Sequence, residues 1–325
     1  MTANPSFSRA EASSTAGGAF GPSAFQHTLA GPAVFAGVGL HTGQRARAAI
    51  LPAPADSGIV FLRTDVEGDG RIEARARNVS STRLSTVIAN ASGAAVSTVE
   101  HLLAALYGLG IDNALVELDG PEAPIMDGSA EPFVRLIDRA GRRRQQAPRQ
   151  AIEILEPVEA TDGGKRAALV PASGFEVFVE IAFESAAIGR QRLDMAVDEE
   201  AFRSTLADCR TFGFLHEVEA LREAGLAQGG SLDNAIVIDG ELVLNPGGLK
   251  RPDEFVRHKA VDAIGDLATL GRPLIGRYEG RYAGHALNNA LARALLARPQ
   301  AWRLRPLAPA QALDDLPARR PGAFA

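Results

Sequence analysis

Residues 253–266 read DEFVRHKAVDAIGD, and they are the most informative stretch of the chain. Apolar residues recur at helical spacing through residues 252–270, which predicts a helix with one buried face. His258, Asp262 and Asp266 follow at four-residue intervals, so they form one polar stripe on that helix. A His and an Asp at this spacing can bind one metal ion. An ordinary hydrogen bond between residues i and i+4 on a solvated face would account for the same stripe.

The composition is that of a water-soluble globular protein. The chain has 325 residues, 46% of them hydrophobic and 22% charged, and this length favours two domains. Its 34 basic residues are outnumbered by 39 acidic ones, so we expect neither nucleic acid nor an anionic membrane as a partner. The single cysteine, Cys209, excludes an intrachain disulfide and a zinc site built from cysteines. A metal would therefore have to bind to histidine and carboxylate.

Targeting signals are not recognisable in this sequence. Residues 1–23 carry neither the charged head nor the apolar run of a secretion signal. The longest uncharged stretch, residues 12–44, is too polar to span a membrane. We therefore expect a cytoplasmic protein without stable membrane insertion.

Strand-like and helix-like segments recur in a similar order in the two halves of the chain. In the first half, strands are expected over 28–35, 45–51, 59–64, 86–90 and 114–118, and helices over 97–108 and 130–140. In the second half, strands are expected over 151–154, 167–170, 175–183, 234–239 and 241–244, and helices over 199–208, 215–226, 252–270 and 286–297. The predicted division is a disordered tail (1–26), a first domain (27–140), a polar linker (141–150), a second domain (151–303) and a second disordered tail (304–325).

A second candidate for metal chemistry lies at the start of the helix expected over 97–108. Glu100 and His101 are adjacent there, and adjacent helical residues diverge by about 100°. This geometry would let His101 bind a metal while Glu100 faces the metal-bound water from the side. A capping glutamate beside a core histidine would explain the pair taken alone.

Two other catalytic or binding motifs are incomplete in this sequence. His216 and Glu217 open a zinc protease motif, but Ala220 stands where the second histidine is required. The glycines of residues 37–43 are spaced wrongly for a dinucleotide loop, and we interpret this stretch as a hairpin turn.

Several of these motifs together resemble one enzyme family. The chain is similar to the UDP-3-O-acyl-N-acetylglucosamine deacetylases, the zinc amidases of lipid A biosynthesis in Gram-negative bacteria. The matching stretches occur in family order over residues 37–43, 97–105, 110–113, 124–130, 210–214, 253–266 and 284–289. They extend from about Thr28 to Trp302.

The resemblance implies a catalytic zinc site. One Zn²⁺ per chain would be held by His101, His258 and Asp262, with water in the fourth position. Zinc lowers the pKa of such a water to roughly 7.

The resemblance also implies the catalytic residues. Glu100 would act as the general base, and His285 would protonate the departing amine. The Thr211 hydroxyl would stabilise the oxyanion together with zinc. Asp266 would orient His285 and keep it protonated, and Lys259 would add positive charge beside the oxyanion.

The family fold is α+β, with two similar domains that each layer helices against β-sheets and an active site in the cleft between them. An insert in the second domain, here residues 213–250, would form the passage for the substrate's acyl chain. Phe183 would stack on the nucleotide. The candidates to line the passage are Phe212, Leu215, Val218, Ala227, Leu232, Ala235 and Val237. Ordinary core packing would explain each of these seven residues equally well.

The sequence therefore predicts hydrolysis of the N-acetyl group of UDP-3-O-(3-hydroxyacyl)-N-acetylglucosamine, which gives UDP-3-O-(3-hydroxyacyl)-glucosamine and acetate. The substrate is a small amphiphilic UDP-sugar, and a monomer is expected. One alternative is a non-heme iron oxygenase, which uses the same class of two histidines and one carboxylate. Another is a metal-binding relative that has lost the chemistry.

Overall fold

The computed structural model describes residues 23–307. Alternating inward apolar side chains in the first half build a five-stranded sheet. Along the sheet the order is β2 (Ala33–Val38), β3 (Arg45–Pro52), β9 (Ala114–Leu118), β4 (Ile59–Arg63) and β5 (Arg71–Glu73). Strand β3 is antiparallel to β2 and β9, whereas β9 is parallel to β4.

The second half repeats this topology strand for strand. Its order is β12 (Val158–Asp162), β13 (Lys165–Val170), β19 (Leu274–Arg281), β14 (Phe175–Ala182) and β15 (Arg190–Ala196). Strand β19 is antiparallel to β13 and parallel to β14, as β9 is to β3 and β4. Two further strands, β11 (Gln150–Ile154) and β20 (Trp302–Pro306), extend this sheet. The repeat confirms the expected α+β fold of two similar domains.

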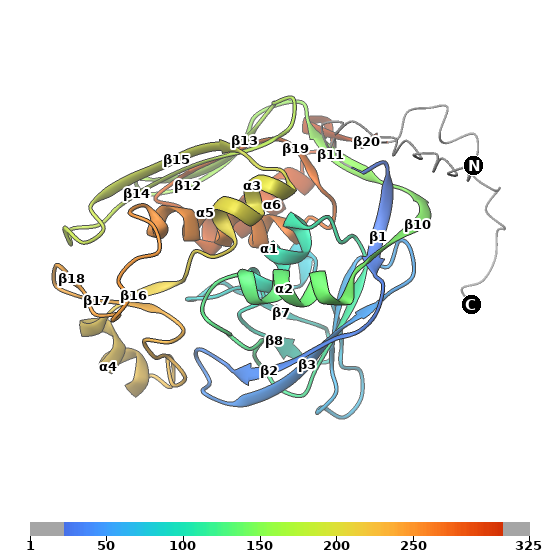
Figure 1. Ribbon diagram of the computed structural model, residues 1–325. Helices are drawn as coiled ribbons and strands as arrows, with labels where there is room; N and C mark the ends of the chain where they lie inside the picture. Colours follow the sequence, from blue (N-terminus) through green and yellow to red (C-terminus); the bar gives the residue numbers. More distant parts are fainter. Residues whose placement is uncertain (1–22, 308–325) are drawn as a thin grey trace, which may run out of the picture.

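The helices lie between the two sheets (Figure 1). The first half contributes α1 (Glu100–Gly108) and α2 (Glu131–Ala140), and the second contributes α5 (Glu254–Ala268) and α6 (His285–Leu296). Helix α1 packs directly on α5. A Cβ atom on Gly265 of α5 would lie 2.0 Å from the carbonyl oxygen of Glu100, so the close crossing requires glycine at this position.

Each half carries an insertion at the same point of its repeat, between the fifth strand and the helix that enters the centre. In the first half it is a small sheet of β6 (Val79–Ser81), β7 (Val87–Ala89) and β8 (Ala95–Val96), preceded by the 3-10 turn η1 (Ala76–Asn78). In the second it holds β16 (Phe212–Phe214), α4 (Leu215–Glu223), β17 (Ile236–Asp239) and β18 (Leu242–Val243). It follows α3 (Glu199–Ala201) and the wider turn η2 (Phe202–Leu206), which together replace the expected helix over 199–208.

The chain segments next to the tails and in the expected linker are ordered strands. Residues 142–148 form β10 (Arg142–Pro148), which pairs with β1 (Phe25–Leu29). Strand β20 pairs with β11 as far as Pro306. The expected tail boundaries were therefore wrong at residues 25–26 and 304–306, because pairing with β10 and β11 holds these residues in strands. Residues 1–22 and 308–325 of the expected tails lie outside the described residues.

Two smaller features complete the described part of the chain. The strand expected over 28–35 is divided between β1 and β2, because Gly31 and Pro32 turn the chain there. The turn η3 (Pro299–Ala301) leads into β20. Within residues 23–307, no helix combines the length and the apolar character needed to cross a membrane.

Candidate metal centre and active site

Three potential metal ligands meet where α1 crosses α5. His101 lies in the first turn of α1, and His258 and Asp262 lie one turn apart on α5. The Oδ1 atom of Asp262 is 3.4 Å from His101 Nε2 and 3.3 Å from His258 Nε2. All three residues are buried, and their ligand atoms lie within 4.8 Å of one another. The structure thus brings together the three residues that the sequence pointed to.

The polar atoms of this cluster fit a metal ion. Asp262 Oδ1 is buried and has no hydrogen-bond partner within residues 23–307, although it faces two imidazoles. His258 Nδ1 lies 3.0 Å from the carbonyl oxygen of Cys209, so a proton on Nδ1 leaves the Nε2 lone pair free to bind a cation. Burial lowers the pKa of His258 to about 3, although the negative charge of Asp262 acts in the opposite direction. The imidazole is therefore neutral at neutral pH. Two nitrogens and one carboxylate oxygen are a donor set that Zn²⁺ and Fe²⁺ both accept.

Lys259 lies beside the cluster. Its Nζ donates a hydrogen bond of 2.9 Å to Asp262 Oδ2, the carboxylate oxygen that does not face the histidines. Burial opposes ionisation of Asp262, but His258 and Lys259 hold the pKa of this carboxyl well below its usual range. Asp262 is therefore ionised at neutral pH.

A proton-transfer pair lies next to the metal cluster. Glu100, adjacent to His101, has its Oε1 atom 3.8 Å from Nε2 of His285 at the start of α6. Burial raises the pKa of Glu100, although His285 and His101 oppose this shift. Burial also works against charge on His285, but Asp266 and Glu100 raise its pKa to about 10. The second ring nitrogen, Nδ1, is 2.9 Å from Asp266 Oδ2. His285 is thus protonated at neutral pH and faces a buried carboxylate.

Thr211 is fixed at the junction of the two halves. Its N–H donates to the carbonyl of Gly128 at 2.8 Å, and its carbonyl accepts from Ile236 N–H at 2.7 Å. Gly128 has φ +84, and a Cβ there would lie 2.1 Å from the carbonyl oxygen of Asn234. Glycine at position 128 therefore lets the 124–130 loop approach the second half closely enough to hold Thr211.

Comparison with known proteins connects this geometry to a family. A family model described as UDP-3-O-acyl N-acetylglycosamine deacetylase matches residues 26–297. The chain belongs to this family. It is accordingly a deacetylase, a hydrolase of lipid A biosynthesis.

Several similar proteins are named UDP-3-O-acyl-N-acetylglucosamine deacetylase, and this chain matches them over most of their length. A UDP-3-O-acyl-N-acetylglucosamine deacetylase of Phenylobacterium zucineum is 67% identical over 285 residues, which make up 87% of this chain and 97% of that protein. One of Anaeromyxobacter sp. is 51% identical over 301 residues, or 92% of this chain and 96% of that protein. One of Acidithiobacillus ferrooxidans is 51% identical over 279 residues, or 85% and 91%.

The aromatic residues of the deacetylase form a cluster beside the metal ligands. The Phe212 ring lies 4.9 Å from Phe255 and 6.3 Å from His258, measured between ring centroids. Phe183 is 5.7 Å from Phe212. The Nζ of Lys259 lies 5.3 Å from the Phe212 ring centroid. Phe183 and Phe212 are half-buried, so each keeps part of its ring surface free for a ligand.

The candidates to line the acyl passage lie outside the main core. Leu215 and Leu232 are 40% and 42% exposed. The other five, Phe212, Val218, Ala227, Ala235 and Val237, are half-buried. Along β17 the alternation buries Ile236 and Ile238 and leaves Val237 on the other face. Phe212 packs against the main core, and the role of all seven side chains in a passage stays a prediction.

The sequence interpretation missed His41. The stretch 37–43 is a turn between β2 and β3, as expected, but the carboxylate of Glu122 accepts hydrogen bonds from the N–H groups of His41 and Thr42. Both ring nitrogens of His41 are buried without a hydrogen-bond partner in the described part of the chain. Burial lowers the pKa of His41, Glu122 opposes this shift, and His285 adds to it. The only sequence signal was the match of this stretch to the family.

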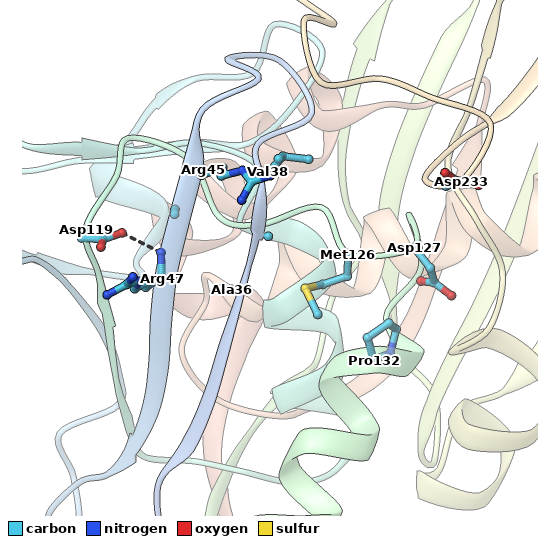
Figure 2. A pocket seen from close by; sticks show the side chains of 11 residues that line it. Ala36, Val38, Arg45, Arg47, Asp119, Met126, Asp127, Pro132 and Asp233 are labelled. Atoms are coloured by element: carbon cyan, nitrogen blue, oxygen red, sulfur yellow. Dashed lines mark hydrogen bonds between the residues drawn. The ribbon is translucent and has the colours of Figure 1, made fainter.

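A cavity of about 900 Å³ lies elsewhere, against the β2–β3 hairpin. Figure 2 shows Arg45 and Arg47 on one side of it and Asp127 and Asp233 on the other. Its lining includes neither the metal ligands nor Glu100 and His285. The candidate catalytic residues at the α1–α5 crossing therefore do not line this cavity.

Proposed function

We propose that the protein is a zinc-dependent hydrolase that removes the N-acetyl group of UDP-3-O-(3-hydroxyacyl)-N-acetylglucosamine. The products are acetate and UDP-3-O-(3-hydroxyacyl)-glucosamine. The observation that carries this proposal is the buried cluster of His101, His258 and Asp262 directly beside the pair Glu100 and His285. The names of the similar proteins support the UDP-linked, acylated sugar as the substrate.

The metal site would contribute one part of the chemistry. His101, His258 and Asp262 would hold one Zn²⁺ per chain, and this ion, when bound, supplies a Lewis acid and a water of lowered pKa. Lys259 keeps the Asp262 carboxylate ionised and adds positive charge on the same side.

The chain's own residues would move the protons. Glu100 takes a proton from the attacking water while the water oxygen bonds to the amide carbon. The Thr211 hydroxyl would donate to the oxyanion that forms on the former carbonyl oxygen. His285 then gives its Nε2 proton to the sugar nitrogen, the C–N bond breaks, and acetate departs. The positive charge that Asp266 stabilises on His285 suits this last step.

The remaining assignments belong to the same proposal. Phe183 would stack on the nucleotide, and the apolar side chains of the 213–250 insert would contact the acyl chain. We expect the enzyme to act as a monomer in the cytoplasm.

The test is acetate release from the substrate by the purified protein loaded with Zn²⁺. Release should fall by about 10²- to 10⁴-fold in Glu100→Ala and in His285→Ala, because each removes one proton-transfer group. Glu159→Ala, a change at an exposed residue of β12, serves as the control and should keep full activity. Undiminished turnover in both site variants would exclude this mechanism, and metal-dependent oxygen uptake without acetate release would favour the oxygenase.

A further inference from the structure

Thr86 connects the two halves of the active site. It lies immediately before β7, in the insertion of the first half, and is 1% exposed. Its N–H donates a 3.0 Å hydrogen bond to Glu100 Oε2, and its carbonyl accepts one of 3.4 Å from Val99 N–H. Both backbone groups of Thr86, its N–H and its carbonyl, are thus bonded to residues at the start of α1.

The side chain of Thr86 reaches into the second half. Its hydroxyl donates to Asp266 Oδ1 on α5 at 2.5 Å, a length typical of a charge-assisted O–H···O⁻ bond. The other oxygen of Asp266, Oδ2, lies 2.9 Å from His285 Nδ1 and accepts from Asn288 Nδ2 at 2.8 Å. Thr86 therefore contacts Glu100, which is adjacent to His101, directly. It reaches His285 through Asp266.

We propose that Thr86 is a positioning residue that sets the relative geometry of Glu100 and His285. This inference rests on the proposed function, because it assigns Thr86 a part in the same proton transfers. Nothing in the geometry places Thr86 against the reacting atoms, and it acts through the two carboxylates.

The two hydrogen bonds of Thr86 determine which oxygen of each carboxylate is free. Because Glu100 Oε2 is bonded to the Thr86 amide, it is Oε1 that faces His285, at 3.8 Å. Because Asp266 Oδ1 is bonded to the Thr86 hydroxyl, the carboxylate cannot rotate about its Cβ–Cγ bond, and Oδ2 stays in line with His285 Nδ1. Catalytic groups must be held to within about 0.5 Å of their productive geometry, and such supporting hydrogen bonds provide that precision.

Thr86→Val tests the hydroxyl without changing the shape of the side chain or the backbone amide. We expect kcat for acetate release to fall about 10- to 100-fold, as is usual for the loss of a supporting hydrogen bond, with KM changed by less than about twofold. Zn²⁺ content should stay at one per chain, since Thr86 touches none of the three ligands. Thr86→Ser restores the hydroxyl and should recover kcat to within about threefold of the unmodified enzyme.

Two controls separate positioning from stability. Thr28→Val removes another buried threonine hydroxyl, the one that accepts from Ala53 N–H at 2.8 Å, and should lower Tm while leaving kcat unchanged. Thr86→Val should also add no more than about a twofold loss of kcat in an Asp266→Asn background, because the two changes act on one hydrogen bond.

The possible outcomes are distinct. Unmodified enzyme that releases no acetate would reject the proposed function, whereas active enzyme whose Thr86→Val variant keeps full kcat would reject the role of Thr86. The role of Thr86 would also be rejected if Thr86→Val lowered kcat by the same factor in the Asp266→Asn background as in the unmodified enzyme. If Thr86→Val does not fold, the pair Thr86→Ser and Thr86→Cys, similar in size, makes the same comparison, and equal kcat in these two variants would overturn the inference.

Discussion

Asp266 is 2% exposed, and the two oxygens of its carboxylate accept hydrogen bonds from three side chains. The coulombic attraction of this carboxyl group raises the pKa of the adjacent imidazole of His285. At the scale of single residues, the site therefore separates two tasks. The proposed mechanism assigns proton uptake to Glu100, whose pKa is raised by burial, and proton donation to His285, whose pKa is raised by Asp266.

Asp266→Asn should move the alkaline limb of the pH profile to lower pH. Burial opposes charge on His285, and Asp266 is the strongest of the carboxylates that raise its pKa to about 10. An amide at position 266 removes that attraction, so His285 loses its proton at a lower pH and activity, which needs the protonated form, is lost earlier. The measurement is kcat/KM for acetate release from pH 6 to 11. An alkaline limb at the same pH in both enzymes would contradict this account.

At the scale of secondary structure, the approach of α1 to α5 decides whether the site exists. Glu100 and His101 begin α1, and the other two candidate metal ligands lie on α5. The two backbones come close at Gly265, where any side chain would meet the carbonyl of Glu100. Gly265 lies within α5 and does not have a positive φ, so glycine is required here for the space it leaves and not for an unusual backbone conformation.

Gly265→Ala should separate the two helices and weaken metal binding. The added methyl would lie 2.0 Å from the Glu100 carbonyl oxygen, so α1 must shift, and overpacking of this kind costs about 1–3 kcal/mol of stability. We expect less Zn²⁺ per chain after dialysis and a fall in kcat. Gly174→Ala, where nothing lies within 4 Å of the new methyl, is the matched control. Full Zn²⁺ content and full activity in Gly265→Ala would show that the crossing tolerates a side chain.

The elements that the sequence predicted are those with an apolar period. Helix α5 was expected over 252–270, and it is found at Glu254–Ala268. Strand β19, the centre of the second sheet, was missed. Its inward positions include Gly276 and Gly280, and its outward ones are Arg277, Glu279 and Arg281, so the stretch has period two but no apolar run.

In the site, too, local spacing and family motifs decided which residues could be predicted. Three ligands could be named because two lie at i, i+4 on one helix and the family motifs supplied the third. The contacts of Thr86 could not be named, since they join residues 14 and 180 positions apart, and no spacing rule covers such distances. His41 was interpreted as part of a turn because the turn signal and a buried imidazole occupy the same residues.

At the scale of the whole molecule, the candidate metal centre lies where the two copies of the duplicated fold meet. The two sheets share one strand order, and the helices from both copies pack against one another between them (Figure 1). His101 comes from the first copy, whereas His258 and Asp262 come from the second. A metal ion bound by all three would therefore join the two halves, and its binding energy would add to the stability of the whole chain.

Metal loading should accordingly raise Tm, and His101 should be required for this effect. A ligand at 1,000 times its Kd stabilises the folded protein by about 4 kcal/mol. Dialysis against a chelator should lower Tm by several degrees, and added Zn²⁺ should restore it. His101→Ala removes the only ligand of the three that comes from the first half, so added Zn²⁺ should then raise Tm little. His216→Ala, on the exposed side of α4, is the control and should respond as the unmodified chain does. A full response in His101→Ala would mean that the cation binds within one half, and the crossing of α1 and α5 would then not be the metal centre.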